Sequence, residues 1–169
     1  LSLPVLFSRK DALARLALGG AALSFILYLS YYHFLFIHIR NAFLLSNLVH
    51  ISTYRAHFVI IGMLFLQLLA VFRALVPKHG RPGGWQFGLR WLAFLLFVFL
   101  VSSEADHYYI MENFREGLLP ATLATQAHKL LYTQLWTALA GAFTLAGILV
   151  PNRIARQHGF VLLTAAGLK

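Results

Sequence analysis

A long apolar run meets a cluster of carboxylates in the stretch "WLAFLLFVFLVSSEADHYYIMENFREGL" (Trp91–Leu118), and this junction indicates the class of fold. Its first eleven residues, "WLAFLLFVFLV", carry no charge. Four of the five acidic residues of the chain follow closely: Glu104, Asp106, Glu112 and Glu116. A block of this kind is typical of a helix that crosses lipid and ends in a polar region.

The composition of the whole chain supports this interpretation. Of the 169 residues, 60% are hydrophobic and only 11% are charged, whereas a soluble domain has about 25% charged residues. The net charge is +9, but the basic residues lie between the apolar blocks and not on one face. We therefore predict no nucleic-acid partner. The absence of cysteine excludes disulfides, thiolate nucleophiles and Cys-ligated metals.

The spacing of the apolar blocks predicts an all-α fold, a transmembrane helical bundle. We predict four complete spans, the start of a fifth and one interfacial helix, which together form a single transmembrane region over residues 1–169. The spans are expected at about 17–37, 57–76, 87–103, 130–150 and 159–169, and the interfacial helix at about 41–55. Because the last block is too short to span, we expect an excerpt of a longer protein.

The positive charges predict which side of the membrane each loop faces, since cytoplasmic loops carry an excess of Lys and Arg. With the N-terminus inside, nine basic residues fall in inner segments and four in outer ones. The inner ones are Arg9, Lys10, Arg15, Arg73, Lys78, Arg81, Arg90, Arg153 and Arg156, and the outer ones are Arg40, Arg55, Arg115 and Lys129. We therefore expect a multi-pass membrane protein with a cytoplasmic N-terminus for this chain and the carboxylate cluster outside.

Three stretches of the second half carry a resemblance to a known family: "SSEADH" (102–107), "AHKLLYTQLWTALAGAF" (127–143) and "NRIARQHGFVLLTAAGLK" (152–169). Residues 102–169 resemble the C-terminal portion of the bacterial multi-spanning membrane proteins called domain of unknown function 2339. In that family a Ser-Glu-x-x-His element ends one span, and an Arg-x-x-Gly turn leads to a span whose Lys precedes an aliphatic run and an Asp. Arg156, Gly159 and Lys169 stand at the positions of the turn and the Lys. The resemblance implies a bacterial inner-membrane protein of the cell envelope with further spans, and no assigned activity.

The polar cluster after the third block has a structural interpretation. Glu104 and His107 are three residues apart, so they share a helix face, while Asp106 points elsewhere. A carboxylate near the membrane is costly unless it is paired, so we expect the pair to brace two helices. The expected partners are each other, Lys129 or Arg115, or Tyr108 and Tyr109. The predicted polar cluster comprises Glu104, Asp106, His107, His128 and Lys129.

Two cofactor alternatives use the histidines. Glu104, His107 and His128 would supply one oxygen and two nitrogens to a zinc ion, as three-ligand catalytic sites do. A bis-histidine haem would draw its ligands from a second set: His33, His50 and His57. Histidines that only anchor helix ends at the interface are the more common arrangement. We therefore predict no cofactor, with zinc and haem as alternatives.

The function follows less directly from the residues. Gln67 and Lys169 are intramembrane polar residues, which are functional hypotheses by default. The leading hypothesis is a non-enzymatic scaffold or a transport-related segment of an envelope protein. The alternative is a membrane-embedded enzyme with an outward-facing metal or acid–base site formed by Glu104, His107 and His128, acting on a lipid or envelope substrate.

The expected partners are the lipid bilayer and the remaining spans of the longer chain. Ala138, Ala142 and Ala146 are spaced by four residues in the fourth block, and small residues at that spacing let helix backbones approach closely. This pattern favours packing within the bundle, with a homo-oligomer face as the alternative.

Overall fold

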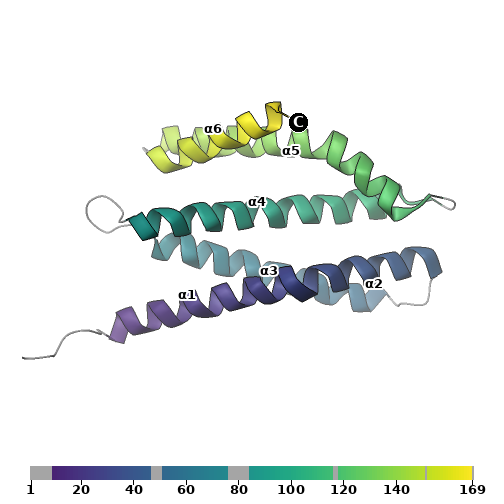
Figure 1. Ribbon diagram of the computed structural model, residues 1–169, viewed down its shortest axis with the longest axis horizontal. Coiled ribbons are helices and arrows are strands. Elements are labelled where there is room, and N and C mark those ends of the chain that lie inside the picture. Colours follow the sequence, from purple (N-terminus) through teal and green to yellow (C-terminus); the bar gives the residue numbers. More distant parts are fainter. Residues whose placement is uncertain (1–8, 47–50, 76–83, 116–117, 151, 169) are drawn as a thin grey trace, which may run out of the picture. The chain divides into compact units, whose positions relative to one another are not determined.

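The computed structural model describes residues 9–46, 51–75, 84–115, 118–150 and 152–168. Their elements, of which Figure 1 labels the α-helices, are α1 (Arg9–Leu27), the π-helix η1 (Tyr28–Tyr32), α2 (His33–Ser46), α3 (Ile51–Ala74), α4 (Gly84–Asn113), α5 (Pro120–Leu149) and α6 (Arg153–Gly167). No strand occurs in these ranges, so the all-α prediction is confirmed for them. The chain forms two compact units, residues 1–93 and 94–169, and the boundary falls inside α4.

The first unit consists of one continuous helical segment and an antiparallel helix. The continuous segment is formed by α1, η1 and α2, which follow one another without a break, and α3 packs against it. Gln67 Nε2, late in α3, donates to Ser24 Oγ of α1 at 3.3 Å. His57, early in α3, packs its ring edge-to-face against Phe36 of α2, with 4.4 Å between the centroids. Early residues of one element therefore meet late residues of the other.

The π-helix η1 keeps the buried side of the continuous segment α1–η1–α2 facing α3. Before the turn the buried residues are Ala21, Phe25 and Tyr28, and after it they are Phe36 and Arg40. Tyr28 and Phe36 are eight positions apart, one more than the roughly seven residues of two α-helical turns. The extra residue of the π-turn absorbs this difference, so both aromatic rings stay on the buried side.

Two arginines of the first unit are held by polar groups of the chain itself. Arg40 is buried, and its Nε and Nη2 donate to Asn41 Oδ1 at 3.1 and 2.9 Å. Arg90, in α4, is also buried and donates to the backbone carbonyl of Leu75, which follows α3. Both guanidinium groups therefore find acceptors within the chain.

The second unit contains the rest of α4 together with α5 and α6. Phe94 of α4 contacts Phe143 of α5 with ring centroids 5.2 Å apart, and it stacks on His158 of α6 at 4.1 Å. Further along α4, Ser102 accepts a hydrogen bond from Trp136 Nε1 at 3.0 Å. As the α4 residue number rises, its α5 partner falls, so these two helices are antiparallel.

α6 folds back on α5 through a tight turn. Asn152 caps α6, since its Oδ1 accepts from the backbone N–H groups of Ile154 and Ala155 at 3.0 and 3.3 Å. Arg156 donates from Nη1 to the carbonyl of Gly147 at 2.7 Å, at the carboxyl end of α5, where a helix favours a cation. Gly159 then lies against the backbone of α5, where a Cβ atom would meet Ala140 O at 2.7 Å.

Several helices extend beyond the predicted spans. Residues 41–46 continue α2 and residues 51–55 begin α3, so the described part of the segment 41–55 forms no separate interfacial helix. α4 continues beyond the apolar block to Asn113, because no residue in "SSEADHYYIMEN" interrupts helical geometry. α5 begins ten positions earlier than predicted, at Pro120, where proline fits the first helical turn.

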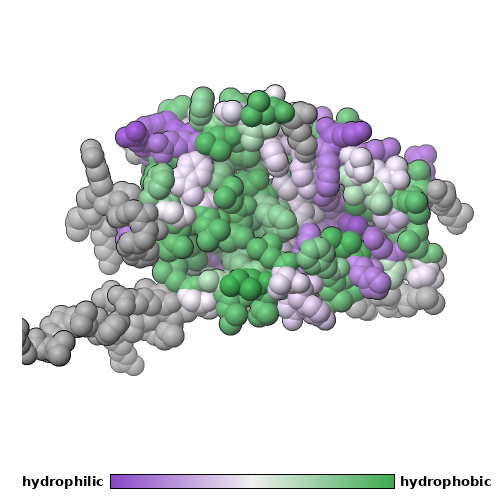
Figure 2. Space-filling view, viewed as in Figure 1, coloured by the Kyte–Doolittle hydropathy of each residue, from purple (hydrophilic) through white to green (hydrophobic). Residues whose placement is uncertain are grey.

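Three helical segments of the described residues are long and apolar enough to cross a membrane: Leu18–Ser46, Arg55–Arg73 and Gln86–Asn113. α5 and the 15-residue α6 are not among them. Large apolar side chains are also exposed, as Figure 2 shows on its visible face. Leu66 of α3 and Leu149 of α5 are 68% and 72% exposed. Water-soluble monomers rarely expose apolar surface so extensively, so these properties suggest a membrane protein.

Candidate functional site

α4 carries two groups of polar residues immediately after its apolar run. Ser102 and Asp106 are four residues apart and share one face, while Glu104 and His107 share another. At about 1.5 Å per residue the 30-residue α4 is about 45 Å long, whereas a hydrocarbon core is about 30 Å thick. A helix whose apolar part spans lipid would therefore carry these residues toward one surface.

Asp106 connects α4 to α5 through a single carboxylate oxygen. The Tyr132 hydroxyl donates to Asp106 Oδ2 at 2.6 Å, and His128 Nε2 lies 2.8 Å from the same oxygen. The Asp106 side chain is 17% exposed, whereas that of His128 is 49% exposed. The other carboxylate oxygen, Oδ1, is buried and has no hydrogen-bond partner among the described atoms. The His128 side of this contact thus reaches the surface, whereas Oδ1 of Asp106 is enclosed.

Trp136 and Ser102 extend this contact by one helical turn. His128, Tyr132 and Trp136 are spaced by four residues on α5, and their rings lie in sequence, with centroid distances of 4.7 and 5.6 Å. The Trp136 indole N–H donates to Ser102 Oγ, and Ser102 is buried. The two helices are therefore joined by a row of polar contacts from Ser102 to Asp106.

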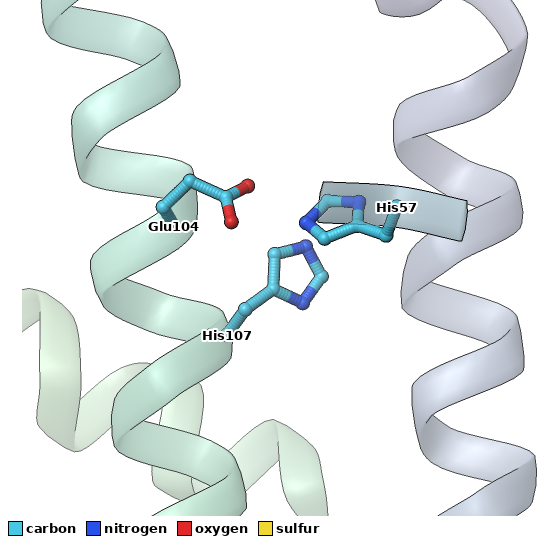
Figure 3. Close-up of side chains that lie close together, drawn as sticks. All are labelled: His57, Glu104 and His107. Carbon is cyan, nitrogen blue, oxygen red and sulfur yellow. The ribbon is translucent and has the colours of Figure 1, made fainter. Parts of the chain in front are cut away.

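Glu104 and His107 project from one side of α4, as Figure 3 shows. His107 is buried, and Glu104 is partly buried. The third residue labelled in Figure 3, His57, belongs to α3 in the first unit and is buried. Its ring packs against that of Phe36. Glu104 and His107 share a face of α4, as predicted from their spacing.

Asp106, a member of the predicted polar cluster, connects α4 to α5. It was expected on another face than Glu104 and His107, and on that face it contacts Tyr132 and His128 of α5. His128 was grouped with Glu104 and His107 in the zinc alternative, and its Nε2 faces Asp106. Lys129 is exposed. The bonding of the Glu104–His107 pair and the ligation of zinc or haem stay predictions.

Sequence reasoning missed Ser102, Tyr132 and Trp136. A usable signal was present, because Ser102 and Asp106 repeat at four residues on one helix and His128, Tyr132 and Trp136 repeat at four on the next. Two polar rows at helical spacing on consecutive antiparallel helices predict a ladder of contacts. The charged residues alone do not indicate these contacts, because their donors include a hydroxyl and an indole group.

The remaining predicted polar residues lie elsewhere. Gln67 donates to Ser24 within the first unit, and its Oε1 is buried without a hydrogen-bond partner among the described atoms. Lys169 and His50 lie outside the described residues. The ring of His33 packs against those of Tyr28 and Phe34, at 6.0 and 5.4 Å. Gln67, which was predicted as an intramembrane polar residue, therefore forms a hydrogen bond between α3 and α1.

The Asp106 cluster has the groups needed for acid–base chemistry. An ionised carboxylate only accepts hydrogen bonds, so His128 donates to Asp106 in the tautomer that carries a proton on Nε2. A tyrosine hydroxyl and an imidazole N–H then converge on one oxygen, which fixes the orientation of the carboxylate.

No protein-family model, no curated protein and no solved structure matches this chain.

Proposed function

We propose that this chain is a multi-pass membrane region whose role is that of a scaffold or a transport-related segment, braced by Asp106 between α4 and α5. The observation that carries the proposal is the convergence of Tyr132 and His128 on Asp106 Oδ2, at the end of an apolar helix. In lipid, interhelical hydrogen bonds contribute to helix association because apolar surface alone provides little driving force.

The proposed topology has four complete spans and the start of a fifth, with the N-terminus on the cytoplasmic side of a bacterial inner membrane. Three apolar helical segments support the coarse part of this topology. For α5, the support is its length of 30 residues and its exposed apolar side chains Leu145, Ile148 and Leu149. The basic residues in the inner segments support the orientation.

We also propose that residues 102–169 belong to the family called domain of unknown function 2339. The support is structural, since Arg156 and Gly159 of the Arg-x-x-Gly element lie in α6 and both contact α5. Determination of the sequence that flanks this chain tests the proposal. Further apolar spans and an Asp soon after Lys169 are expected, and a flanking sequence without apolar spans would contradict it.

A double-mutant cycle measures the brace directly. Asp106→Ala, Tyr132→Phe and the double variant are compared with the wild-type chain by their free energies of unfolding in detergent micelles. Because each single variant removes the same hydrogen bond, the two effects are expected to be non-additive by about 1 kcal/mol. The exposed Glu112→Gln, on the same helix, is the control and is expected to change stability little. Strict additivity would refute the brace.

A further inference from the structure

The beginning of α1, the end of α3 and the beginning of α4 lie at the same end of the first unit. α1 and α3 are antiparallel, because Gln67, late in α3, contacts Ser24 of α1, whereas His57, early in α3, contacts Phe36 of α2. α1 therefore starts where α3 ends. α4 starts there too, since Arg90 near its beginning donates to the backbone carbonyl just after α3.

The amino-acid sequence concentrates positive charge in these parts of the chain. Residues 9–15 contain three basic residues and one acidic residue, Asp11, and residues 73–90 contain four basic residues and no acidic one. Asp11 is also the one acidic residue among residues 1–93, the first unit. One carboxylate does not neutralise seven cations, so the two stretches keep a net charge of +6. This charge favours anions that come from outside the unit.

Arg73 and Arg90 are the basic residues of these stretches whose side chains the structure describes. Arg90 is 9% exposed, and its acceptor among the described residues is the carbonyl of Leu75, a neutral group. A guanidinium has five N–H donors, so one carbonyl leaves most of them for a further acceptor. Arg73 lies in the last turn of α3, two residues before Leu75, and its side chain is exposed. Both arginines therefore belong to the region around the end of α3.

The bond from Arg90 to Leu75 has a structural role of its own, because a cation is favoured near the carboxyl end of a helix. That role accounts for one of the two arginines and leaves the exposed Arg73 unexplained. The amino end of a helix favours anions, and α4 begins at Gly84 without an acidic residue in its first turn. The beginning of α4 thus adds to the preference of this region for an anion.

Apolar side chains are exposed next to both arginines. Leu69, one turn before Arg73 on α3, is 57% exposed, and Phe87, three residues before Arg90 on α4, is 43% exposed. The ring of Phe87 lies 6.2 Å from that of Trp91, centroid to centroid, and tryptophan is enriched where a membrane meets water. The region therefore combines cations with apolar surface, which suits an amphiphilic anion.

We propose that this end of the first unit binds an anionic phospholipid, whose phosphate accepts hydrogen bonds from Arg73 and Arg90 and whose acyl chains lie against Leu69 and Phe87. Basic sites between membrane helices bind anionic headgroups, and the planar fork of arginine matches phosphate oxygens. One apolar segment, Arg55–Arg73, ends here and another, Gln86–Asn113, begins here. The inference rests on the membrane location in the proposed function and adds a lipid partner to it.

Native mass spectrometry of the whole chain in neutral detergent micelles tests the lipid site. The probes are phosphatidylglycerol, which is anionic, and phosphatidylcholine with the same acyl chains, which has no net charge. Phosphatidylglycerol is expected to bind at least about fivefold more tightly, the contribution of one basic residue near an anionic headgroup. Equal affinities would overturn the proposal. Inorganic phosphate should not displace the lipid, and displacement would overturn the lipid assignment in favour of a free anion.

Substitution of the arginines locates the site. Arg73→Gln and Arg90→Gln should each weaken phosphatidylglycerol binding at least about fivefold, and the exposed position of Arg73 should preserve the fold in the first variant. The matched control is Arg55→Gln, an exposed arginine about 27 Å away along α3, beyond the screening length of salt. Its affinity should stay within about twofold of wild type. Wild-type affinity in Arg73→Gln, or an equal loss in Arg55→Gln, would overturn the proposal.

Failure of the lipid site and failure of the brace give different results. Asp106 and Tyr132 belong to the second unit, whereas Arg73 and Arg90 belong to the first. Coupled stabilities in the Asp106–Tyr132 cycle without a preference for phosphatidylglycerol would refute only the lipid site. Additive stabilities with that preference intact would refute only the brace.

Discussion

Gly159→Ala is expected to destabilise the α5–α6 pair by about 3 kcal/mol, because the added methyl group overlaps backbone atoms that cannot move independently. A Cβ atom at this position would meet Ala140 O at 2.7 Å and Thr144 N at 2.9 Å. Both atoms belong to the regular backbone of α5, so relief requires the two helices to separate. The free energy of unfolding in detergent micelles measures the effect.

The matched control for this substitution is Gly141→Ala on α5. A Cβ atom there meets nothing within 4 Å, and alanine is the better helix former by about 1 kcal/mol. The same chemical change should therefore be neutral or stabilising at one position and strongly destabilising at the other. Equal effects at Gly159 and Gly141 would mean that α6 does not pack against α5 as described.

Phe94→Ala is expected to cost about 4 kcal/mol, the usual range for deletion of a buried aromatic side chain. Phe94 is 1% exposed and contacts Phe143 of α5 and His158 of α6. Its loss removes contacts to two helices at once and leaves a cavity between them, in a setting where close packing provides much of the stability. Thermal unfolding followed by near-ultraviolet circular dichroism would report the loss.

Leu95 provides the comparison for Phe94. It is the next residue on α4 and is 57% exposed, so Leu95→Ala removes a large apolar side chain without a cavity. We expect a change below about 1 kcal/mol. If both variants had the same stability, Phe94 would not be the residue that joins α4 to its two neighbours.

The apolar blocks predicted the helices well because helix formation in lipid follows from local composition. An apolar run without charge must satisfy its backbone groups internally, and a helix does this within one segment. The helix ends were harder to predict, because they depend on contacts beyond the segment. Arg40, for instance, marks a span end by its charge, but its bonds to Asn41 allow the helix to continue.

The candidate site was predicted in part. The position of the polar cluster and the joining of α4 to α5 followed from the sequence. The contact of Asp106 with α5 did not follow from it, because that contact depends on how α4 is rotated about its axis relative to α5. Packing of apolar residues such as Phe94 and Phe143 sets that rotation. Two side chains that are two residues apart on a helix lie on opposite faces. The sequence spacing alone does not show which of these faces lies against α5.

The central claim is that lipid surrounds the exposed apolar faces of these helices. Because the chain contains no cysteine, each introduced cysteine is a unique label site. Leu66→Cys and Glu112→Cys both place a thiol at an exposed position, the first in the middle of α3 and the second near the end of α4. In sealed proteoliposomes, a membrane-impermeant maleimide is predicted to label Glu112→Cys and to leave Leu66→Cys unmodified. Equal labelling of both thiols would contradict the claim.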